Sequence, residues 1–278
     1  MSQVDQYAVF GSPIKHSKSP RIHKLFAEQT QQAMQYSAEL VLAEQFSGAV
    51  NAFFAQGGRG LNCTVPLKEL AWEYADLRTE RAELAKAVNT LAFQGDGHIL
   101  GDNTDGIGLV ADIQNNHAIS LQQKRILILG AGGASRGIIL PIMGEVPVSI
   151  TVVNRTVAKA VTLANEFKHK GAITGCGYAD LAGQSFDLIL NATSASLSDE
   201  LPPLAAGLLA EQGSCYDLAY ANKATAFVHW GHEQQAIKSL DGLGMLVEQA
   251  AEAFYVWRGV RPYTAAVIQM LEAERNLS

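Results

Sequence analysis

The feature that constrains this chain most is an apolar strand that runs directly into a glycine-rich turn. Arg125–Leu129 is apolar after its first residue, and residues 130–137 read Gly-Ala-Gly-Gly-Ala-Ser-Arg-Gly before a helical segment. Glycines there let the backbone turn tightly and approach a pyrophosphate at the helix N-terminus. Ser135 replaces the third glycine of G-x-G-x-x-G, and a small residue still permits close helix–strand packing. The segment therefore predicts a dinucleotide-binding strand–turn–helix unit.

Strand-like and helix-like segments alternate along the rest of the chain, which is typical of an α/β protein. Continuous apolar strands separated by helices predict a doubly wound parallel sheet, covered on both faces. Its strands are expected at Arg125–Leu129, Ser149–Val153, Asp187–Leu190 and Ser214–Leu218.

The N-terminal third predicts a separate α/β unit. A strand is expected at Tyr7–Phe10, and a helix opens with Ser19 as N-cap and Pro20 at its first position. A strand at Gly60–Val65 leads into a helix that starts at Pro66. A β-hairpin with a Gly-Asp-Gly turn follows over residues 88–100. The final stretch, residues 244–271, is helical in pattern with a break around residues 259–262.

The strand after the glycine-rich turn indicates which dinucleotide is bound. In NAD enzymes, an acidic residue about 20 positions on hydrogen-bonds the ribose hydroxyls. Here the strand ends in Asn154-Arg155-Thr156, and Lys159 follows one turn later. No carboxylate is present to repel a 2′-phosphate, whereas two cations and a hydroxyl can bind it. These residues favour NADP.

Composition excludes several other function classes. The chain has 278 residues with a net charge of −6 and no run of Lys or Arg, so neither a nucleic acid nor an anionic membrane surface is the expected partner. The N-terminus lacks a signal-peptide pattern, and no apolar stretch is long enough for a spanning helix. Cys63, Cys176 and Cys215 form no CxxC pair and fit reduced thiols of a cytoplasmic protein. His16 and His23 have no third ligand nearby, so no metal site is expected.

Four short polar segments in the N-terminal third contain candidate substrate residues: residues 11–20, 62–68, 88–91 and 101–106. Together with Gly-Ala-Gly-Gly-Ala-Ser-Arg-Gly, Asn-Arg-Thr, Asn191-Ala192-Thr193-Ser194 and the segment Asp241–Val247 followed by Gln249, these motifs occur in order along nearly the whole chain. In them the chain resembles the shikimate dehydrogenases.

The resemblance implies a domain organisation and an activity. An N-terminal α/β substrate-binding and catalytic domain would comprise residues 1–104 and 241–278, with the C-terminal helices returning to it. A Rossmann-like NADP-binding domain would comprise residues 105–240. The implied activity is the reversible NADPH-dependent reduction of 3-dehydroshikimate to shikimate, within chorismate and aromatic amino acid biosynthesis.

The resemblance also assigns site residues. Those implied to bind the substrate are Ser17, Ser19, Thr64, Lys68, Asn89, Asp105, Tyr220 and Gln249. Asn62 is a further candidate, because it points to the same face of its strand as Thr64. Those implied to bind NADP are Glu80, Gly130, Ala131, Gly132, Gly133, Ala134, Asn154, Arg155, Thr156, Lys159, Thr193, Leu218 and Gly242. A helix N-terminus favours an anion, so Ser19 can cap its helix and still help to hold a carboxylate.

Lys68 and Asp105 match the catalytic pair of the family. Hydride transfer to a ketone produces an alkoxide that must gain a proton, so an acid/base group has to lie within hydrogen-bond reach. A lysine held by an aspartate can donate that proton and stabilise the developing charge. The sequence does not indicate which of the two transfers the proton.

Some alternatives stay open. A quinate/shikimate dehydrogenase with broader substrate and cofactor use is one, and a non-catalytic NADP-binding sensor is another. The oligomeric state is also open, and a homodimer is compatible with the sequence. Lys86, Ser196 and Ala226 stand where the family often has Gly, Gly and Pro. Of these departures, Ser196 leaves the conformation of its loop undecided.

Overall fold

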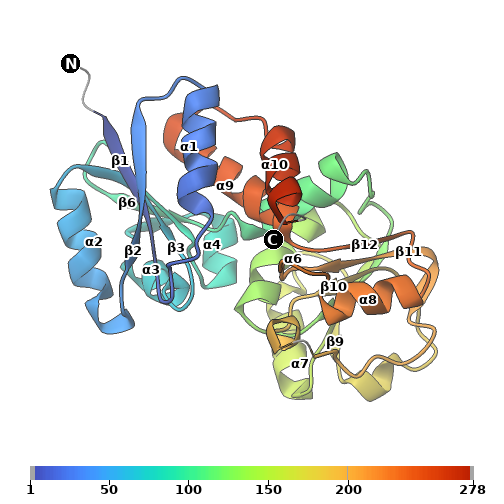
Figure 1. The fold of residues 1–278 in the computed structure, drawn as a ribbon. Coiled ribbons are helices and arrows are strands. Elements are labelled where there is room, and N and C mark those ends of the chain that lie inside the picture. Colours follow the sequence, from blue (N-terminus) through green and yellow to red (C-terminus); the bar gives the residue numbers. More distant parts are fainter. Residues whose placement is uncertain (1–3, 199, 276–278) are drawn as a thin grey trace. The chain divides into compact units, whose positions relative to one another are not determined.

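The computed structural model describes residues 4–198 and 200–275, and its contacts divide the chain into two compact units (Figure 1). The first unit runs to Gly108 and includes Leu246–Gln269, whereas the second contains Leu109–Met245 and begins again at Met270. Residues 1–3 and 276–278 of the predicted substrate-binding domain lie outside the described residues. No helix among residues 4–198 and 200–275 is long and apolar enough to cross a membrane.

The first unit is built on a six-stranded mixed sheet with the strand order β2-β1-β3-β5-β6-β4. Strands β1, β2 and β3 are mutually parallel, whereas β5 runs antiparallel to both β3 and β6. The strands are β1 (Asp5–Gly11), β2 (Met34–Leu40), β3 (Gly58–Cys63), β4 (Leu77–Arg78), β5 (Thr90–Phe93) and β6 (Ile99–Asp102). The β5–β6 pair confirms the predicted hairpin.

Helices cover this sheet and bury its apolar side chains. Helix α1 lies against β1 and β2, and α2 lies against β3 (Figure 1). The core includes Phe10, Leu61 and Leu91, each at most 1% exposed. The helices wholly in this unit are α1 (Ser19–Gln29), α2 (Phe46–Ala55), α3 (Lys68–Tyr74) and α4 (Glu80–Ala85), with a 3₁₀ turn at Ala43–Gln45. Three more helices lie partly in it: α5 (Asp105–Ala111), α9 (Leu243–Arg258) and α10 (Ala265–Arg275). The break between α9 and α10 falls where the sequence predicts it.

Two predicted helix starts are wrong by one or two residues. Helix α1 has Lys18, not Ser19, at its N-cap, and Lys18 already has helical dihedral angles. The hydroxyl of Ser17 instead accepts a hydrogen bond from the backbone N–H of Ser19, at 3.3 Å. Helix α3 begins at Lys68 rather than at Pro66. Pattern arguments place a boundary only to within a residue or two.

The second unit is a six-stranded, fully parallel sheet with the order β12-β11-β10-β7-β8-β9. The strands are β7 (Arg125–Leu129), β8 (Ser149–Val153), β9 (Ile173–Cys176), β10 (Phe186–Asn191), β11 (Leu209–Asp217) and β12 (Lys238–Leu240). Four of them match the prediction, but β9 and β12 were not predicted. Both are short edge strands without a continuous apolar run, so their sequences carry no clear signal.

The helices of the second unit connect these parallel strands. They are α6 (Gly133–Gly144), α7 (Val157–Phe167) and α8 (Ala226–Glu233), with a π-helical turn at Asp112–Asn116 and 3₁₀ turns at Tyr178–Leu181 and Ala195–Ser198. From β7 the chain first moves to β8 and β9, then returns to β10 and moves the other way. Right-handed crossovers therefore place α6 and α7 on one face of the sheet and α8 on the other.

Candidate active site

The glycine-rich turn lies at the point where the strand order of the second sheet reverses. Strands β7 and β10 are neighbours there, and open α/β sheets bind ligands beside the carboxyl ends of such strands. Gly130 has a φ of +99°, which favours glycine. A β-carbon at Gly130 would also come within 3.2 Å of the Ala192 carbonyl oxygen and the Thr193 methyl group.

The next residues leave the N-terminus of α6 open. Gly132 is its N-cap, and β-carbons added at Gly132 or Gly133 would meet nothing within 4 Å. Ala131 is half-buried and Ala134 is exposed. The fully buried Ser135 donates a hydrogen bond from Oγ to the Gly130 carbonyl, at 2.8 Å, and so ties the helix back to the turn.

The predicted 2′-phosphate residues gather at the carboxyl end of β8. Arg155, Thr156 and Lys159 are exposed, and the Asn154 side chain donates to the Thr156 carbonyl at 3.0 Å. Burial raises the pKa of Tyr178, and the nearby charge of Arg155 offsets part of that rise. No Asp or Glu lies between residues 154 and 160. The segment that follows β8 therefore carries two cations and no carboxylate.

The remaining cofactor candidates do not all lie in the second unit. Thr193 follows β10, where its hydroxyl donates to Asn191 Oδ1 at 2.7 Å. Leu218 follows β11, and a β-carbon at Gly242 would lie only 2.2 Å from the Leu218 carbonyl oxygen, so this contact requires glycine. Glu80, by contrast, is the first residue of α4 in the first unit.

The first unit brings the predicted catalytic pair into direct contact. Lys68 is the first residue of α3 and Asp105 the first of α5. Lys68 Nζ lies 2.6 Å from Asp105 Oδ2, and the two side chains are 30% and 18% exposed. The pair is thus shielded from bulk water but still accessible to a small molecule.

Asn89 connects this pair to the C-terminal helices. Its Nδ2 donates to Asp105 Oδ1 and Thr104 Oγ1, both at 2.9 Å, and lies 3.3 Å from Gln249 Oε1. Gln249 lies on α9, which explains why residues so distant in sequence belong to one polar cluster. The sequence predicted Asn89 and Gln249 but not their contact.

Asn62 extends the cluster toward α1. Its Nδ2 donates to the Asn89 carbonyl at 3.0 Å and to Thr90 Oγ1 at 3.1 Å. The Tyr36 hydroxyl donates to Asn62 Oδ1 at 2.6 Å. Burial raises the pKa of Tyr36 well above its usual value, and a hydrogen bond with Ser19 offsets part of that rise. Tyr36 is not among the predicted site residues, because it lies on β2, a polar strand without a clear sequence pattern.

The remaining substrate candidates lie on other segments of the chain. Ser17 and Ser19 lie at the N-terminus of α1, whose dipole favours an anion. Thr64 follows β3, and its methyl group lies 2.4 Å from where a β-carbon on Gly11 would be. Tyr220 belongs to the second unit, where burial raises its pKa. Among the described residues there is no group of three His, Cys, Asp or Glu side chains able to hold a metal.

Comparisons with known proteins match this arrangement. Residues 9–91 match the "Shikimate dehydrogenase substrate binding domain", residues 112–198 match "Shikimate / quinate 5-dehydrogenase", and residues 242–272 match the "Shikimate 5'-dehydrogenase C-terminal domain". The chain is 62% identical to the shikimate dehydrogenase (NADP(+)) of Methylococcus capsulatus over 276 residues, which is 99% of each chain. The chain belongs to the shikimate dehydrogenase family.

Solved structures of similar proteins agree with this membership. The Ael1 enzyme from Pseudomonas putida is 50% identical, with a TM-score of 0.92 over 96% of this chain and 98% of the other. The shikimate 5-dehydrogenase of Thermus thermophilus, in complex with NADP(H) and shikimate, is 30% identical, with a TM-score of 0.85 over 98% and 99% of the two chains. The predicted fold class of a shikimate dehydrogenase, an α/β substrate domain with a Rossmann-like domain, is confirmed.

Proposed function

We propose that the chain catalyses the reversible NADPH-dependent reduction of 3-dehydroshikimate to shikimate, a step of chorismate and aromatic amino acid biosynthesis. It is then an NADP-dependent oxidoreductase acting on a CH–OH group. The observation that carries this proposal is the 2.6 Å Lys68–Asp105 pair in a polar cluster with Asn89 and Gln249. Membership of the shikimate dehydrogenase family supplies the substrate class.

NADPH fits the residues of the second unit. The open N-terminus of α6 can receive a pyrophosphate, with Gly130, Ala131, Gly132, Gly133 and Ala134 around it. Asn154, Arg155, Thr156 and Lys159 would hold the 2′-phosphate, because this segment carries two exposed cations and no carboxylate. Thr193, Leu218 and Gly242 complete the proposed set in the second unit, and Glu80 of the first unit is a further proposed contact. When bound, NADPH supplies the hydride.

The Lys68–Asp105 pair would handle the proton. Asp105 holds the Lys68 ammonium at 2.6 Å and so orients its N–H groups. In the reducing direction the pair protonates the ketone oxygen as it becomes a hydroxyl, and in the reverse direction it removes that proton. Asn89 keeps Asp105 in place by donating to its other oxygen, at 2.9 Å.

The first unit would bind the substrate through its polar cluster. Ser17 and Ser19 at the N-terminus of α1 suit the carboxylate, because hydroxyls and the helix dipole both favour an anion. Asn62, Thr64, Asn89 and Gln249 suit the ring hydroxyls, and Tyr220 of the second unit is a further proposed substrate contact. Residues 1–104 and 241–278 would form the substrate-binding domain, and residues 105–240 the NADP-binding domain.

A direct assay tests the activity. The purified chain is mixed with shikimate or quinate and with NADP⁺ or NAD⁺, and the absorbance of the reduced nicotinamide is followed. We expect the cofactor to be reduced fastest when shikimate and NADP⁺ are supplied together. Faster turnover with quinate and NAD⁺ would favour the broader quinate/shikimate enzyme instead.

Replacing Lys68 tests the mechanism and the non-catalytic alternative together. We expect Lys68→Ala to lose about 10²–10⁴-fold in kcat while still binding NADP, because one member of the proton-transferring pair is lost but the cofactor residues are intact. Lys168→Ala, an exposed lysine at the end of α7, is the matched control. Unchanged turnover in Lys68→Ala would remove Lys68 from the mechanism.

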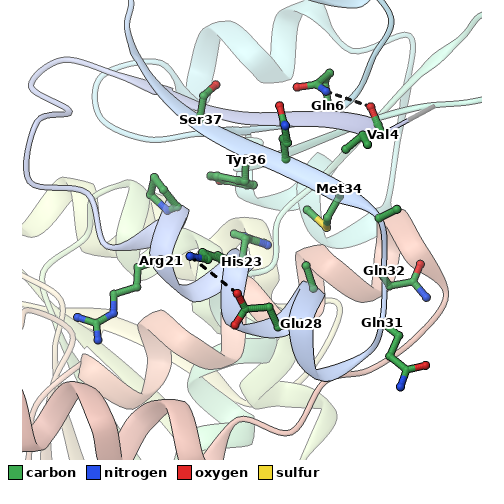
Figure 2. Close-up of a pocket in the computed structure, with 15 residues that line it drawn as sticks. Val4, Gln6, Arg21, His23, Glu28, Gln31, Gln32, Met34, Tyr36 and Ser37 are labelled. Atoms are coloured by element: carbon green, nitrogen blue, oxygen red, sulfur yellow. Dashed lines mark hydrogen bonds and ion pairs between the residues drawn. The ribbon is translucent and has the colours of Figure 1, made fainter. Parts of the chain in front are cut away.

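We further propose that the chain forms a homodimer through strand β2. Within residues 4–198 and 200–275, strand β2 pairs with β1 alone and lies at the edge of its sheet. With α1 it borders a groove of about 1010 Å³ (Figure 2). In antiparallel pairing of two copies centred on Ser37, Gln35 would face Glu39 of the second copy, so like charges do not oppose each other. The edge also lacks the lysines and prolines that block strand addition.

Sedimentation velocity of the wild type and of Ser37→Lys tests the dimer. Two lysines would face each other at the two-fold axis and repel, so we expect a dimeric wild type and a monomeric variant. A monomeric wild type, or a variant that stays dimeric, would refute this interface.

We also propose a cytoplasmic location. Cys63, Cys176 and Cys215 are all free, and burial raises the pKa of Cys215 to about 12, which keeps its thiol protonated. Free thiols suit a reducing compartment. Fractionation of the native cells checks this, and recovery in an extracytoplasmic fraction would contradict it.

A further inference from the structure

The second unit contains a fully buried carboxylate that the proposed mechanism does not use. Asp217 is the last residue of β11 and is 0% exposed. Burial raises its pKa, although hydrogen bonds to the carboxylate oppose that rise. Uncompensated burial of a carboxylate is costly, so the donors around it indicate what holds it there.

Four donors surround the carboxylate of Asp217. Its Oδ2 accepts from Ser196 Oγ at 2.5 Å and from Thr225 Oγ1 at 2.7 Å. Its Oδ1 accepts from the Ala219 backbone N–H at 3.1 Å and from Asn191 Nδ2 at 3.2 Å. Asn191 is the last residue of β10 and Ser196 lies in the segment that follows it, whereas Ala219 and Thr225 lie in the segment that follows β11.

The contacts continue from Asp217 to a proposed cofactor residue. Asn191 accepts at Oδ1 from both the backbone N–H and the hydroxyl of Thr193, at 3.2 and 2.7 Å. The Leu218 backbone N–H donates to the Asn191 carbonyl at 2.9 Å. The Asp217–Asn191 contact thus sets the position of both Thr193 and Leu218.

Ser196 completes this arrangement in a way specific to its side chain. It donates to Asp217 and also accepts from Asn191 Nδ2 at 2.9 Å, so it connects the same two residues a second time. A glycine at this position could make neither contact. Ser196 therefore adds two side-chain hydrogen bonds at the junction of the two loops.

We propose that Asp217 and Ser196 are positioning residues for NADPH, which hold the loops after β10 and β11 in the conformation that places Thr193 and Leu218. Neither residue is assigned a contact with the cofactor, so both act through their neighbours. Thr225 extends the effect to α8, because its hydroxyl donates to Asp217 and also accepts the Val228 N–H as the helix cap. This inference rests on the proposed function, since it assumes that Thr193 and Leu218 contact NADPH.

The test is the affinity for NADPH of Ser196→Ala, measured by nicotinamide fluorescence, together with the kinetic constants. Hydrogen bonds to charged groups are the stronger ones, so we expect Kd and KM for NADPH to rise about tenfold or more. The KM for shikimate should stay unchanged. Ser196→Thr keeps the hydroxyl and should restore most of the affinity. Asp217→Asn should weaken NADPH binding further, because it replaces an acceptor oxygen with a donor group.

Ser198→Ala is the matched control. Ser198 lies in the same 3₁₀ turn and is exposed, and its hydroxyl donates to the Ala195 carbonyl, at 3.1 Å. We expect its NADPH affinity to equal that of the wild type. The inference would be overturned if Ser196→Ala bound NADPH as tightly as the wild type, or if Ser196→Ala and Ser198→Ala lost affinity equally. Either result would leave the proposed function intact. Failure of the wild type to bind NADPH would instead refute the proposed function.

Discussion

His23 is expected to make the stability of the first unit depend on pH. It is 0% exposed and stacks on Tyr36 with ring centroids 4.2 Å apart. Burial lowers its pKa from 6.5 to about 3, and the neighbouring Asn62 side chain offsets only part of this fall. Neither ring nitrogen has a hydrogen-bond partner among the described residues. The folded state therefore holds His23 as a neutral ring.

The sign and the size of the effect follow from linkage. Between about pH 6.5 and 3 the unfolded state binds a proton at His23 that the folded state does not, so stability rises with pH in this window and is lost as pH falls. One pKa unit corresponds to about 1.4 kcal/mol. At about pH 5, roughly 1.5 units below the unfolded pKa, the loss at this residue is about 2 kcal/mol relative to about pH 7.

The perturbation is His23→Phe, compared with the wild type by urea unfolding at both pH values. Phenylalanine keeps the aromatic packing but does not titrate, so we expect the variant to lose about 2 kcal/mol less between about pH 7 and about pH 5. A Trp230→Phe background leaves only Trp72 and Trp257, both in the first unit, as fluorescent tryptophans. His98→Phe, at an exposed histidine, is the control. An equal pH dependence in His23→Phe and the wild type would refute the reasoning.

Three further outcomes are expected. Arg155→Ser should weaken NADP binding about tenfold or more relative to NAD binding in fluorescence titrations, because a contact with the 2′-phosphate is lost. Equal weakening of the two affinities would contradict the assignment of Arg155 to the 2′-phosphate. Arg81→Met should lower the free energy of unfolding by about 3–5 kcal/mol, measured in urea, because Asp102 and Glu252, with side chains 3% and 9% exposed, both lose their shared guanidinium. A loss below about 1 kcal/mol would mean that the three charges do not form a buried network. Gly130→Ala should reduce NADP affinity, because φ at this position is +99° and alanine would strain the turn. An unchanged affinity in a titration would show that the turn tolerates a side chain.

The parts of the fold that were predicted correctly have strong local signals. The buried strand β7 and the glycine-rich turn after it are contiguous in sequence, so one window contains the strand, the turn and the helix start. The β5–β6 hairpin likewise carries its turn residues between its strands. Edge strands gave no such signal: β2 is mostly exposed, and β12 has three residues. Their strand conformation comes from pairing with β1 and β11, which no local pattern encodes.

The same division applies to the candidate site. The sequence by itself determined the residue types: a lysine and an aspartate able to move a proton, cations in place of an acidic residue, and glycines at the turn. Only the tertiary structure decided which of them touch, because Lys68 and Asp105 are 37 residues apart and Asn89 and Gln249 are 160 residues apart. It alone also revealed Tyr36 beside Asn62, and the four donors around Asp217. Hydrogen bonds need contact within about 3 Å, and chain folding sets such distances between segments that share no local pattern.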